Sequence, residues 1–263
     1  MNISLLGIDL AKNVFQLHGI DKKGKPLMRK QLKREHLLSF IANTPSCTIA
    51  MEACGSAHYW GRQFEKLGHV VKLISPQYVK PFVKGNKNDR NDALAITEAA
   101  RRPDQYFVSI KGVNQQDIQN IHRVRQRLLT QRTALSNQIR GLLAEYGIAI
   151  PKGFSTLKKR LPQILEDAEN ELTADTRELF FELQEEFREL DKRISIYDHK
   201  LKQLFKTNAN CQRIAKIEGI GPIVATAIIS RLGNPKQFKN GRHFAAFLGL
   251  VPRHVSSGGK TNL

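Results

Sequence analysis

The sequence predicts an α/β domain, followed by a long α-helical coiled-coil segment and a small, mainly α C-terminal domain. Three observations indicate this order. In the first part of the chain, short runs of branched apolar residues alternate with amphipathic stretches, as strands alternate with helices. From Gln115 the apolar residues recur at helical spacing. From about Asn210 the chain is short, basic and rich in glycine. We therefore place the domains at 1–110, 111–208 and 209–263.

Five strands are expected in the first domain, because each is a short apolar or alternating run bounded by turn residues. They cover Ile3–Asp9, Val14–Ile20, Lys25–Leu32, Cys47–Met51 and Val70–Ile74. The helices are expected at Arg34–Asn43, Ser56–Leu67, Gln77–Val83 and about Asp92–Arg102. Three strands joined by short turns form an antiparallel meander, and strands separated by helices run parallel. The order βββαβαβα predicts a ribonuclease-H-like domain.

The helical segment contains a heptad pattern in its second half. Its apolar residues alternate spacings of four and three: Leu183, Phe187, Leu190, Ile194, Tyr197, Leu201 and Leu204. This seam predicts either an intramolecular hairpin with the earlier helix or a dimerising coiled coil, and the two can hold together. Between the two helices, Pro151, Gly153 and Pro162 are expected to break the helical run.

The charge of the chain indicates a polyanionic partner. Lys and Arg number 42 against 24 Asp and Glu, so the formal net charge is +18, and nucleic acid is favoured over a membrane surface. Between Lys111 and Arg160 the only acidic residues are Asp117 and Glu145. The three cysteines form no CxxC pair, which argues against a zinc knuckle. No signal peptide and no membrane-spanning run is found, so a cytoplasmic setting is expected.

Four carboxylates lie at the ends of the predicted elements. Asp9 ends the first strand, Glu52 follows the fourth, and Asp89 and Asp92 begin the last helix. In the predicted topology the first and fourth strands are neighbours and this helix packs across them, so the four acids converge. Such oxygen ligands suit Mg²⁺ or Mn²⁺, and paired divalent ions support phosphodiester cleavage. Each acid alone is more often a cap or turn residue; the prediction rests on three separate element ends each supplying one.

Two further motifs carry candidate nucleic-acid contacts. Ile214–Ile229 matches a helix-hairpin-helix, in which Gly219 and Gly221 allow a tight turn that can hold a phosphate. An ordinary helical packing unit is the plain alternative, and the basic surroundings favour DNA contact. The arginine-rich helix is expected to bind RNA or DNA phosphates. Its members are Arg123, Arg125, Arg127, Arg132 and Arg140.

The loop LGLVPRHVSSGGK holds two serines, Ser256 and Ser257, among glycines and the cations Arg253 and Lys260. Small residues let a backbone approach a phosphate, and a serine needs nearby positive charge to act as a nucleophile. By spacing alone, a polar loop with capping serines is the better interpretation.

Taken together, these motifs resemble one family. The stretches GIDLAKNVF, MEACGSAHYW, NKNDRNDALAI, IEGIGPIVATAIISRLG and FKNGRHFAAFLGLVPRHVSSGGK resemble the DEDD transposases of bacterial insertion sequences, now described as bridge-RNA-guided recombinases. The resemblance covers nearly the whole chain. It implies a RuvC-like N-terminal domain in which Asp9, Glu52, Asp89 and Asp92 bind Mg²⁺. It also implies a C-terminal transposase domain whose catalytic serine matches Ser256, with Ser257 the less favoured choice.

The resemblance implies further partners. They are donor and target DNA, a structured guide RNA that base-pairs with both, and further copies of the chain, as a dimer or tetramer assembled through the coiled coil, with active sites shared between protomers. A nucleoid-associated location in a bacterial cytoplasm is expected. Family members usually continue past the point matching Leu263 with a basic helical stretch, so the C-terminal domain is expected to be truncated.

Two other functions are open. A Holliday-junction resolvase would cut with metal-activated water, so Ser256→Ala would keep cleavage whereas Asp9→Ala would lose it. A non-catalytic nucleic-acid-binding remnant would bind in a salt-sensitive way without metal-dependent cutting. The presence of all four acids and the serine argues against the remnant.

Overall fold

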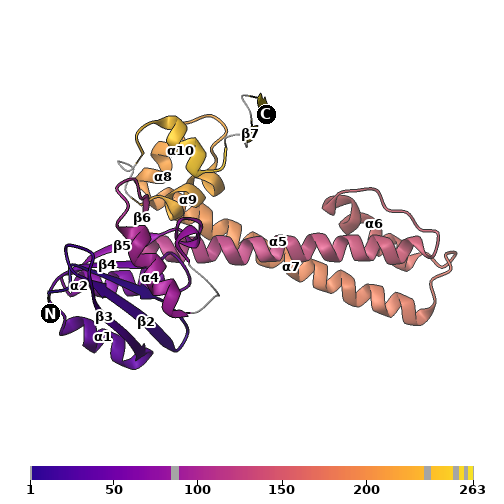
Figure 1. Cartoon of the computed structure of the whole chain (residues 1–263). Helices are drawn as coiled ribbons and strands as arrows, with labels where there is room; N and C mark the ends of the chain where they lie inside the picture. Colours follow the sequence, from indigo (N-terminus) through magenta and orange to yellow (C-terminus); the bar gives the residue numbers. More distant parts are fainter. Residues whose placement is uncertain (1, 84–88, 234–237, 251–254, 258–259, 263) are drawn as a thin grey trace. The chain divides into compact units, whose positions relative to one another are not determined.

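The computed structural model describes residues 2–83, 89–233, 238–250, 255–257 and 260–262, with residues 89–90 and the last two segments as backbone only. The chain divides into two compact units (Figure 1). The first, called here the sheet unit, comprises 1–112 and 232–263. The second, the hairpin unit, comprises 113–231. The domain boundaries predicted above place 209–231 with the C-terminal residues instead, and they stay predictions.

The sheet unit is built on a six-stranded mixed sheet. Its strands are β1 (Leu5–Asp9), β2 (Val14–Ile20), β3 (Pro26–Lys33), β4 (Thr48–Glu52), β5 (Val70–Ile74) and β6 (Phe107–Val108). Its helices are α1 (Arg34–Ala42), α2 (Ala57–Lys66), α3 (Pro76–Val79), the 3₁₀ turn η1 (Lys80–Phe82), α4 (Asp89–Ala100) and α10 (Gly241–Phe247). A separate two-stranded ribbon joins β7 (Val255–Ser257) to β8 (Lys260–Asn262).

The strand order is β3-β2-β1-β4-β5-β6. The first three strands pair antiparallel, whereas β4 is parallel to both β1 and β5. This is the predicted ribonuclease-H-like arrangement, and the α/β fold class of the N-terminal part is confirmed. The short strand β6, antiparallel to β5, was not predicted, because a two-residue strand leaves no periodic signal.

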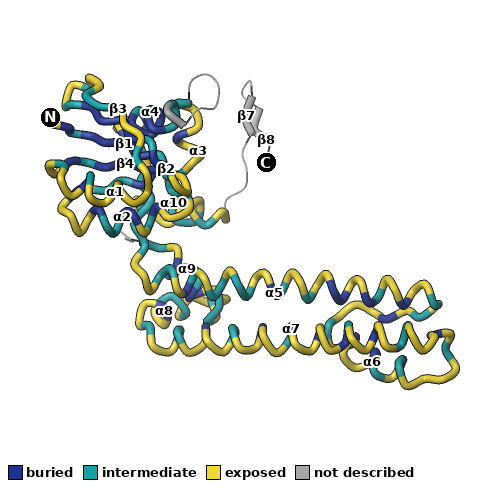
Figure 2. Tube along the Cα trace, turned by 90° about the horizontal axis from the view of Figure 1, so that it is seen from below, coloured by how far each residue is buried: buried dark blue, intermediate teal, exposed yellow. Residues whose placement is uncertain are grey.

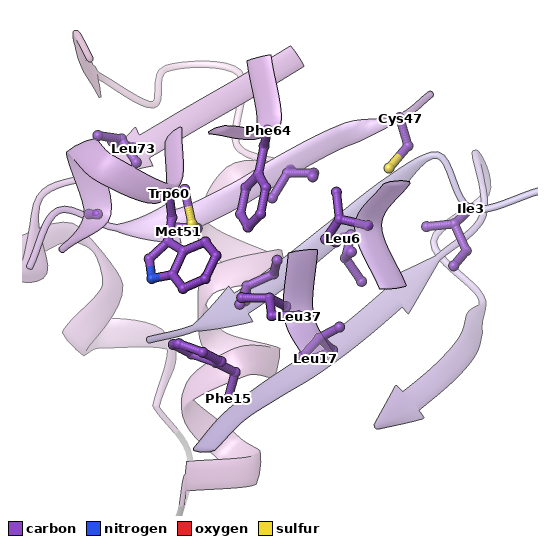
Figure 3. Packing of buried hydrophobic residues seen from close by; sticks show 14 residues of the cluster. Ile3, Leu6, Phe15, Leu17, Leu37, Cys47, Met51, Trp60, Phe64 and Leu73 are labelled. Atoms are coloured by element: carbon purple, nitrogen blue, oxygen red, sulfur yellow. The ribbon is translucent and has the colours of Figure 1, made fainter. Parts of the chain in front are cut away.

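Helices cover both faces of the sheet. On one face α1 and α2 enclose an apolar core that contains Phe15, Trp60 and Phe64 (Figure 3). Phe15 meets the edge of Trp60, and Trp60 stacks on Phe64. On the other face α4 packs against a second core that includes Leu5 and Ile96. The sheet is therefore buried centrally on both sides, as its nearly continuous apolar strands require.

The hairpin unit consists of two long antiparallel helices and shorter ones at their ends (Figure 1). They are α5 (Val113–Ala144), α6 (Phe154–Glu166), α7 (Ala174–Thr207), α8 (Ala209–Ile214) and α9 (Pro222–Arg231). Arg125 of α5 pairs with Asp198 of α7, and Arg132, seven residues on, pairs with Asp191, seven residues back. Because the residue number rises by seven on α5 and falls by seven on α7, the two helices run antiparallel, and the two ion pairs are one heptad apart.

The heptad seam of α7 faces α5 within the same chain. Phe187, Leu190 and Ile194 are buried in one cluster with Leu135 and Ile139 of α5, and Figure 2 shows buried positions recurring along both helices. The intramolecular hairpin is therefore observed. A coiled coil between chains stays a prediction.

The structure corrects the prediction that Pro162 breaks the helical run. Pro162 lies inside α6. A proline there removes one helical hydrogen bond, but α6 buries Leu157, Leu161 and Ile164 in the hairpin core, and the guanidinium of Arg132 lies 4.1 Å from the ring centroid of Phe154. Tertiary packing therefore outweighs the local cost. Among the helices of the described part of the chain, none is both long and apolar enough to cross a membrane.

Candidate functional site

The first two acids lie side by side at one edge of the sheet. The parallel register pairs Leu5 with Thr48 and runs on to Ile8 with Met51. Asp9 and Glu52 are the next residues of the same two strands, and both side chains are partly exposed. Neighbouring strands are about 4.8 Å apart, so the sheet itself holds these carboxylates together, as the topology predicted.

Helix α4 carries the other two acids, and Gly7 decides where it lies. A Cβ built on Gly7 would stand 2.7 Å from the carbonyl oxygen of Ala93, so the helix rests on the bare backbone of β1. Asp92 immediately precedes Ala93, and its charge acts on Glu52, the neighbour of Asp9 across the two strands. Asp89 is the first residue of α4, and its side chain lies outside the described residues. The helix starts one turn earlier than predicted, because the polar DRND segment is itself helical.

A hydrogen-bonded pair fixes α4 on the sheet. The Thr97 hydroxyl donates to the Ala93 carbonyl at 2.8 Å, and it lies 3.2 Å from Nδ1 of His18 in β2. Burial and then the nearby Arg29 charge lower the pKa of His18, which favours the neutral imidazole. Sequence reasoning missed this support. Its one signal was the glycine within an apolar strand, which often marks close backbone approach.

The charges of Asp9, Glu52 and Asp92 affect the pKa values of groups at this edge of the sheet. Burial, and then the negative charge of Asp92, raises the pKa of Glu52. Burial raises the pKa of the Cys54 thiol as well, with further contributions from Glu52 and then Asp9. Asp92 therefore lies within electrostatic range of Glu52, and Glu52 and Asp9 lie within electrostatic range of Cys54.

The donor set fits a divalent cation. Carboxylate oxygens are the ligands that Mg²⁺ and Mn²⁺ prefer, and a cation would relieve the repulsion between Glu52 and Asp92. Within the described residues no three His, Cys, Asp or Glu side chains gather closely enough to hold a metal by themselves. The site is thus formed by acids that approach one another, with the side chain of Asp89 outside the described residues.

Ser56 was another feature missed by sequence reasoning. It is the N-cap of α2 and has φ +69°, the one left-handed non-glycine residue of the described chain. It lies four residues after Glu52 in the sequence. A serine at a helix start is an ordinary cap in sequence, so nothing in the pattern indicated this conformation.

The arginine-rich helix divides into two groups. Arg125 and Arg132 form ion pairs with α7, and Arg140 donates to the Gly153 carbonyl at 2.6 Å. These three arginines hold the hairpin together. Arg123 and Arg127 are exposed, and Arg127 donates to Gln131 of its own helix. Nucleic-acid binding by all five stays a prediction.

The two C-terminal motifs are placed as follows. Gly219 has φ +82° in the turn between α8 and α9, a conformation that favours glycine, and Gly221 is exposed one residue before α9. Ser256 and Ser257 lie on β7, where Ser256 is opposite Thr261 and Ser257 is opposite Lys260 of β8. Within the polar loop expected from spacing, Val255–Ser257 thus form a strand that pairs antiparallel with Lys260–Asn262. Arg253 lies outside the described residues.

Comparisons with known proteins agree with this architecture. Two family models match the chain: a DEDD transposase model over residues 6–148 and the "Transposase IS116/IS110/IS902 family" model over 211–263. The chain is 47% identical over its whole length to a "Probable family 20 transposase" of Pseudomonas aeruginosa and covers 78% of it. It is 44% identical, over 98% of its length and 71% of the relative, to the transposase for insertion sequence element IS1111A of Coxiella burnetii.

Among solved structures, "T. thermophilus RuvC in complex with Holliday junction substrate" is similar over 41% of this chain and 100% of its own, at 14% identity and a TM-score of 0.30. The family matches and the relatives above decide the assignment. The chain belongs to the IS110 family of DEDD transposases, enzymes of bacterial insertion sequences.

Proposed function

We propose that this transposase is an RNA-guided DNA recombinase that cuts and rejoins DNA through a serine nucleophile and metal-binding carboxylates. The observation that carries the proposal is the convergence of Asp9, Glu52 and Asp92 at one edge of the sheet. Membership of a DEDD transposase family implies a divalent metal in general terms. We assign Mg²⁺, with Mn²⁺ as its substitute, to these three acids and Asp89.

In this account the carboxylates prepare a phosphate for attack. A divalent ion held there would withdraw charge from the phosphate oxygens. Asp9 and Glu52 are supplied by rigid strands and Asp92 by a helix fixed on them, so the ligands need little rearrangement. Burial, and then the Asp92 charge, raises the pKa of Glu52, and a cation held between the acids would offset the second of these effects.

Ser256 is the proposed nucleophile. Its Oγ gives up a proton and forms a bond to phosphorus while the bond from phosphorus to the departing sugar oxygen breaks, and that oxygen gains a proton. The result is a covalent serine–DNA linkage that a second sugar hydroxyl reverses when the strands are rejoined. Arg253 and Lys260 are the cations that would stabilise charge on the phosphate. Ser257 is the less favoured alternative.

Other surfaces are assigned to nucleic acid. The turn at Gly219 and Gly221 would hold a DNA backbone through its amide groups. Among the arginines of this helix, Arg123 and Arg127 are best placed to contact phosphates. Their side chains are exposed, whereas the other three bind partners elsewhere in the hairpin. Sequence choice would be delegated to base pairing by a structured guide RNA, and a dimer or tetramer would form through the long helices.

The test combines the protein with its element's flanking RNA, donor DNA and target DNA in Mg²⁺. The reaction is stopped in denaturant, and protein covalently joined to a DNA strand is sought for wild type, Ser256→Ala and Asp9→Asn. Asp104→Asn, an exposed acid away from the site, is the matched control. We expect an adduct in wild type and Asp104→Asn only.

Each other outcome rejects part of the proposal. Cleaved DNA without an adduct, retained in Ser256→Ala, would indicate hydrolysis at the carboxylates, as in a resolvase. An adduct that persists in Ser256→Ala and disappears in Ser257→Ala would move the nucleophile by one residue. Binding of RNA without any cutting would indicate a binding protein.

A further inference from the structure

We propose that the outer strand β3 provides a positively charged track for the DNA strand that enters the carboxylate site, through Gln31, Arg29 and Lys33, with Gln16 of β2 linking the track to the acids. This inference rests on the proposed function and specifies how its substrate is held.

The pairing of the strands places four polar residues side by side across the sheet. Asp9 of β1 lies opposite Gln16 of β2, and Gln16 lies opposite Gln31 of β3. Glu52 follows the last paired residue on the other side of β1. Residues opposite each other in a sheet point to the same face. Glu52, Asp9, Gln16 and Gln31 therefore form one row across four adjacent strands.

That row lies on the face of the sheet that carries α4. His18, two residues from Gln16, contacts Thr97 of α4. The alternate residues Phe15 and Leu17 lie in the core on the opposite face. Odd-numbered residues of β3 thus share the α4 face, and the influence of Arg29 on the pKa of His18 agrees with this placement. By contrast, Lys30 lies over the ring of Phe40 on the other face, 4.6 Å from its centroid.

Helix α4 does not close this face over β3. It packs on β1, β2, β4 and β5, and Arg29, Gln31 and Lys33 are exposed. Among the described residues, neither Arg29 nor Lys33 forms an ion pair with a carboxylate. The row from Glu52 to Gln31 spans three strand spacings, about 14 Å, which corresponds to about four nucleotides of a B-form strand.

The chemistry of the row suits a phosphodiester backbone. Along the row from β4 to β3, the negatively charged side chains are Glu52 and Asp9. The amides of Gln16 and Gln31 come next and can donate hydrogen bonds to phosphate oxygens. The cations lie on β3, at the edge of the sheet. A basic edge strand also prevents strands of different molecules from pairing. That role needs charge on either face and gives no reason for amides in register with the acids.

The first test measures binding of a fluorescein-labelled DNA duplex in Ca²⁺ over a range of salt concentrations. Arg29→Gln/Lys33→Gln is compared with Lys22→Gln/Lys23→Gln, a pair that removes the same charge at the turn on the far end of these strands. We expect the first pair to lose about tenfold in affinity at moderate salt and to reduce the salt slope by about 1–2. The control pair should change affinity less than twofold. Equal losses in both pairs would overturn the proposal.

The second test identifies the contacting molecule. The photoreactive residue p-benzoylphenylalanine replaces Gln31, or Lys23 as control, in protein bound to RNA and DNA. Crosslinking of Gln31 to DNA, with none from Lys23, supports the track. Crosslinking to RNA, or to neither, overturns it. If the track fails while Asp9→Asn still abolishes cutting, the proposed function stands. If wild type never cuts, the proposed function fails whatever the crosslinks show.

Discussion

A Cβ on Gly7 would stand 2.7 Å from the Ala93 carbonyl oxygen, closer than side chains approach backbone in folded proteins. The contact sets the height of α4 above β1, and with it the place of Asp92 relative to Asp9. Gly7 is therefore required by the packing of the helix that carries Asp92.

Gly7→Ala should push α4 away from the sheet. We expect a loss of about 1–3 kcal/mol in the free energy of unfolding, the usual cost of overpacking, measured by urea denaturation. Gly141→Ala is the control, because a Cβ there meets nothing within 4 Å and the residue lies in α5. It should stabilise the protein by about 0.5–1 kcal/mol. Equal stability of the two variants would show that α4 is not held as described.

Asp191 should stabilise the hairpin through two cations. It accepts a hydrogen bond from Nη1 of Arg132 at 2.5 Å, and Nζ of Lys158 lies 3.4 Å away. Asp191→Asn would leave the mostly buried Arg132 without its charge partner, so unfolding free energy should fall by about 1–3 kcal/mol. Glu189→Gln, an exposed neighbour on α7, should change it by less than about 0.5 kcal/mol. A similar small effect in both variants would make the ion pair incidental.

Acidification should weaken the fold through His122. Its Nε2 lies 3.0 Å from the Thr226 hydroxyl of α9, and burial, then Arg125 and Arg231, lowers its pKa from 6.5. Below pH 6.5, His122 binds a proton in the unfolded chain, whereas in the folded chain it does so only at lower pH. The stability that neutral His122 contributes is therefore present at neutral pH and is lost as the pH falls. His18 acts in the same direction.

The measurement compares urea denaturation at about pH 7.5 and about pH 5.5 for wild type and His122→Gln, whose amide can keep the bond to Thr226. The variant should lose less stability between the two pH values than wild type does. An identical loss in both proteins would assign the pH dependence to other groups.

Much of the sheet unit could be predicted from sequence. The strands Val14–Ile20 and Val70–Ile74 have the predicted bounds, because strong apolar runs end there at turn residues. The adjacency of Asp9 and Glu52 followed from the topology alone, since parallel neighbouring strands end at the same edge of the sheet. Whether these acids and Ser256 are functional stays a prediction.

What could not be predicted depended on tertiary contacts. Pro162 is tolerated within α6 because Leu161 and Ile164 are buried beside it. The ion pairs of Arg125 and Arg132 with α7 could not be predicted, because no local sequence pattern says where α7 lies relative to α5. The left-handed Ser56 likewise has no signature in sequence, because serine is an ordinary helix cap.

A metal centre at this edge of the sheet is tested by Mn²⁺ binding to the protein–DNA complex, followed by electron paramagnetic resonance of the free ion. Wild type is compared with Asp9→Asn, Glu52→Gln and Asp92→Asn, and with Asp104→Asn as the exposed control. We expect each of the three site variants to weaken Mn²⁺ binding by about tenfold or more, because each loses a charged ligand, and Asp104→Asn to bind as wild type does. Undiminished binding in Asp9→Asn and Glu52→Gln would contradict a metal centre at this edge of the sheet.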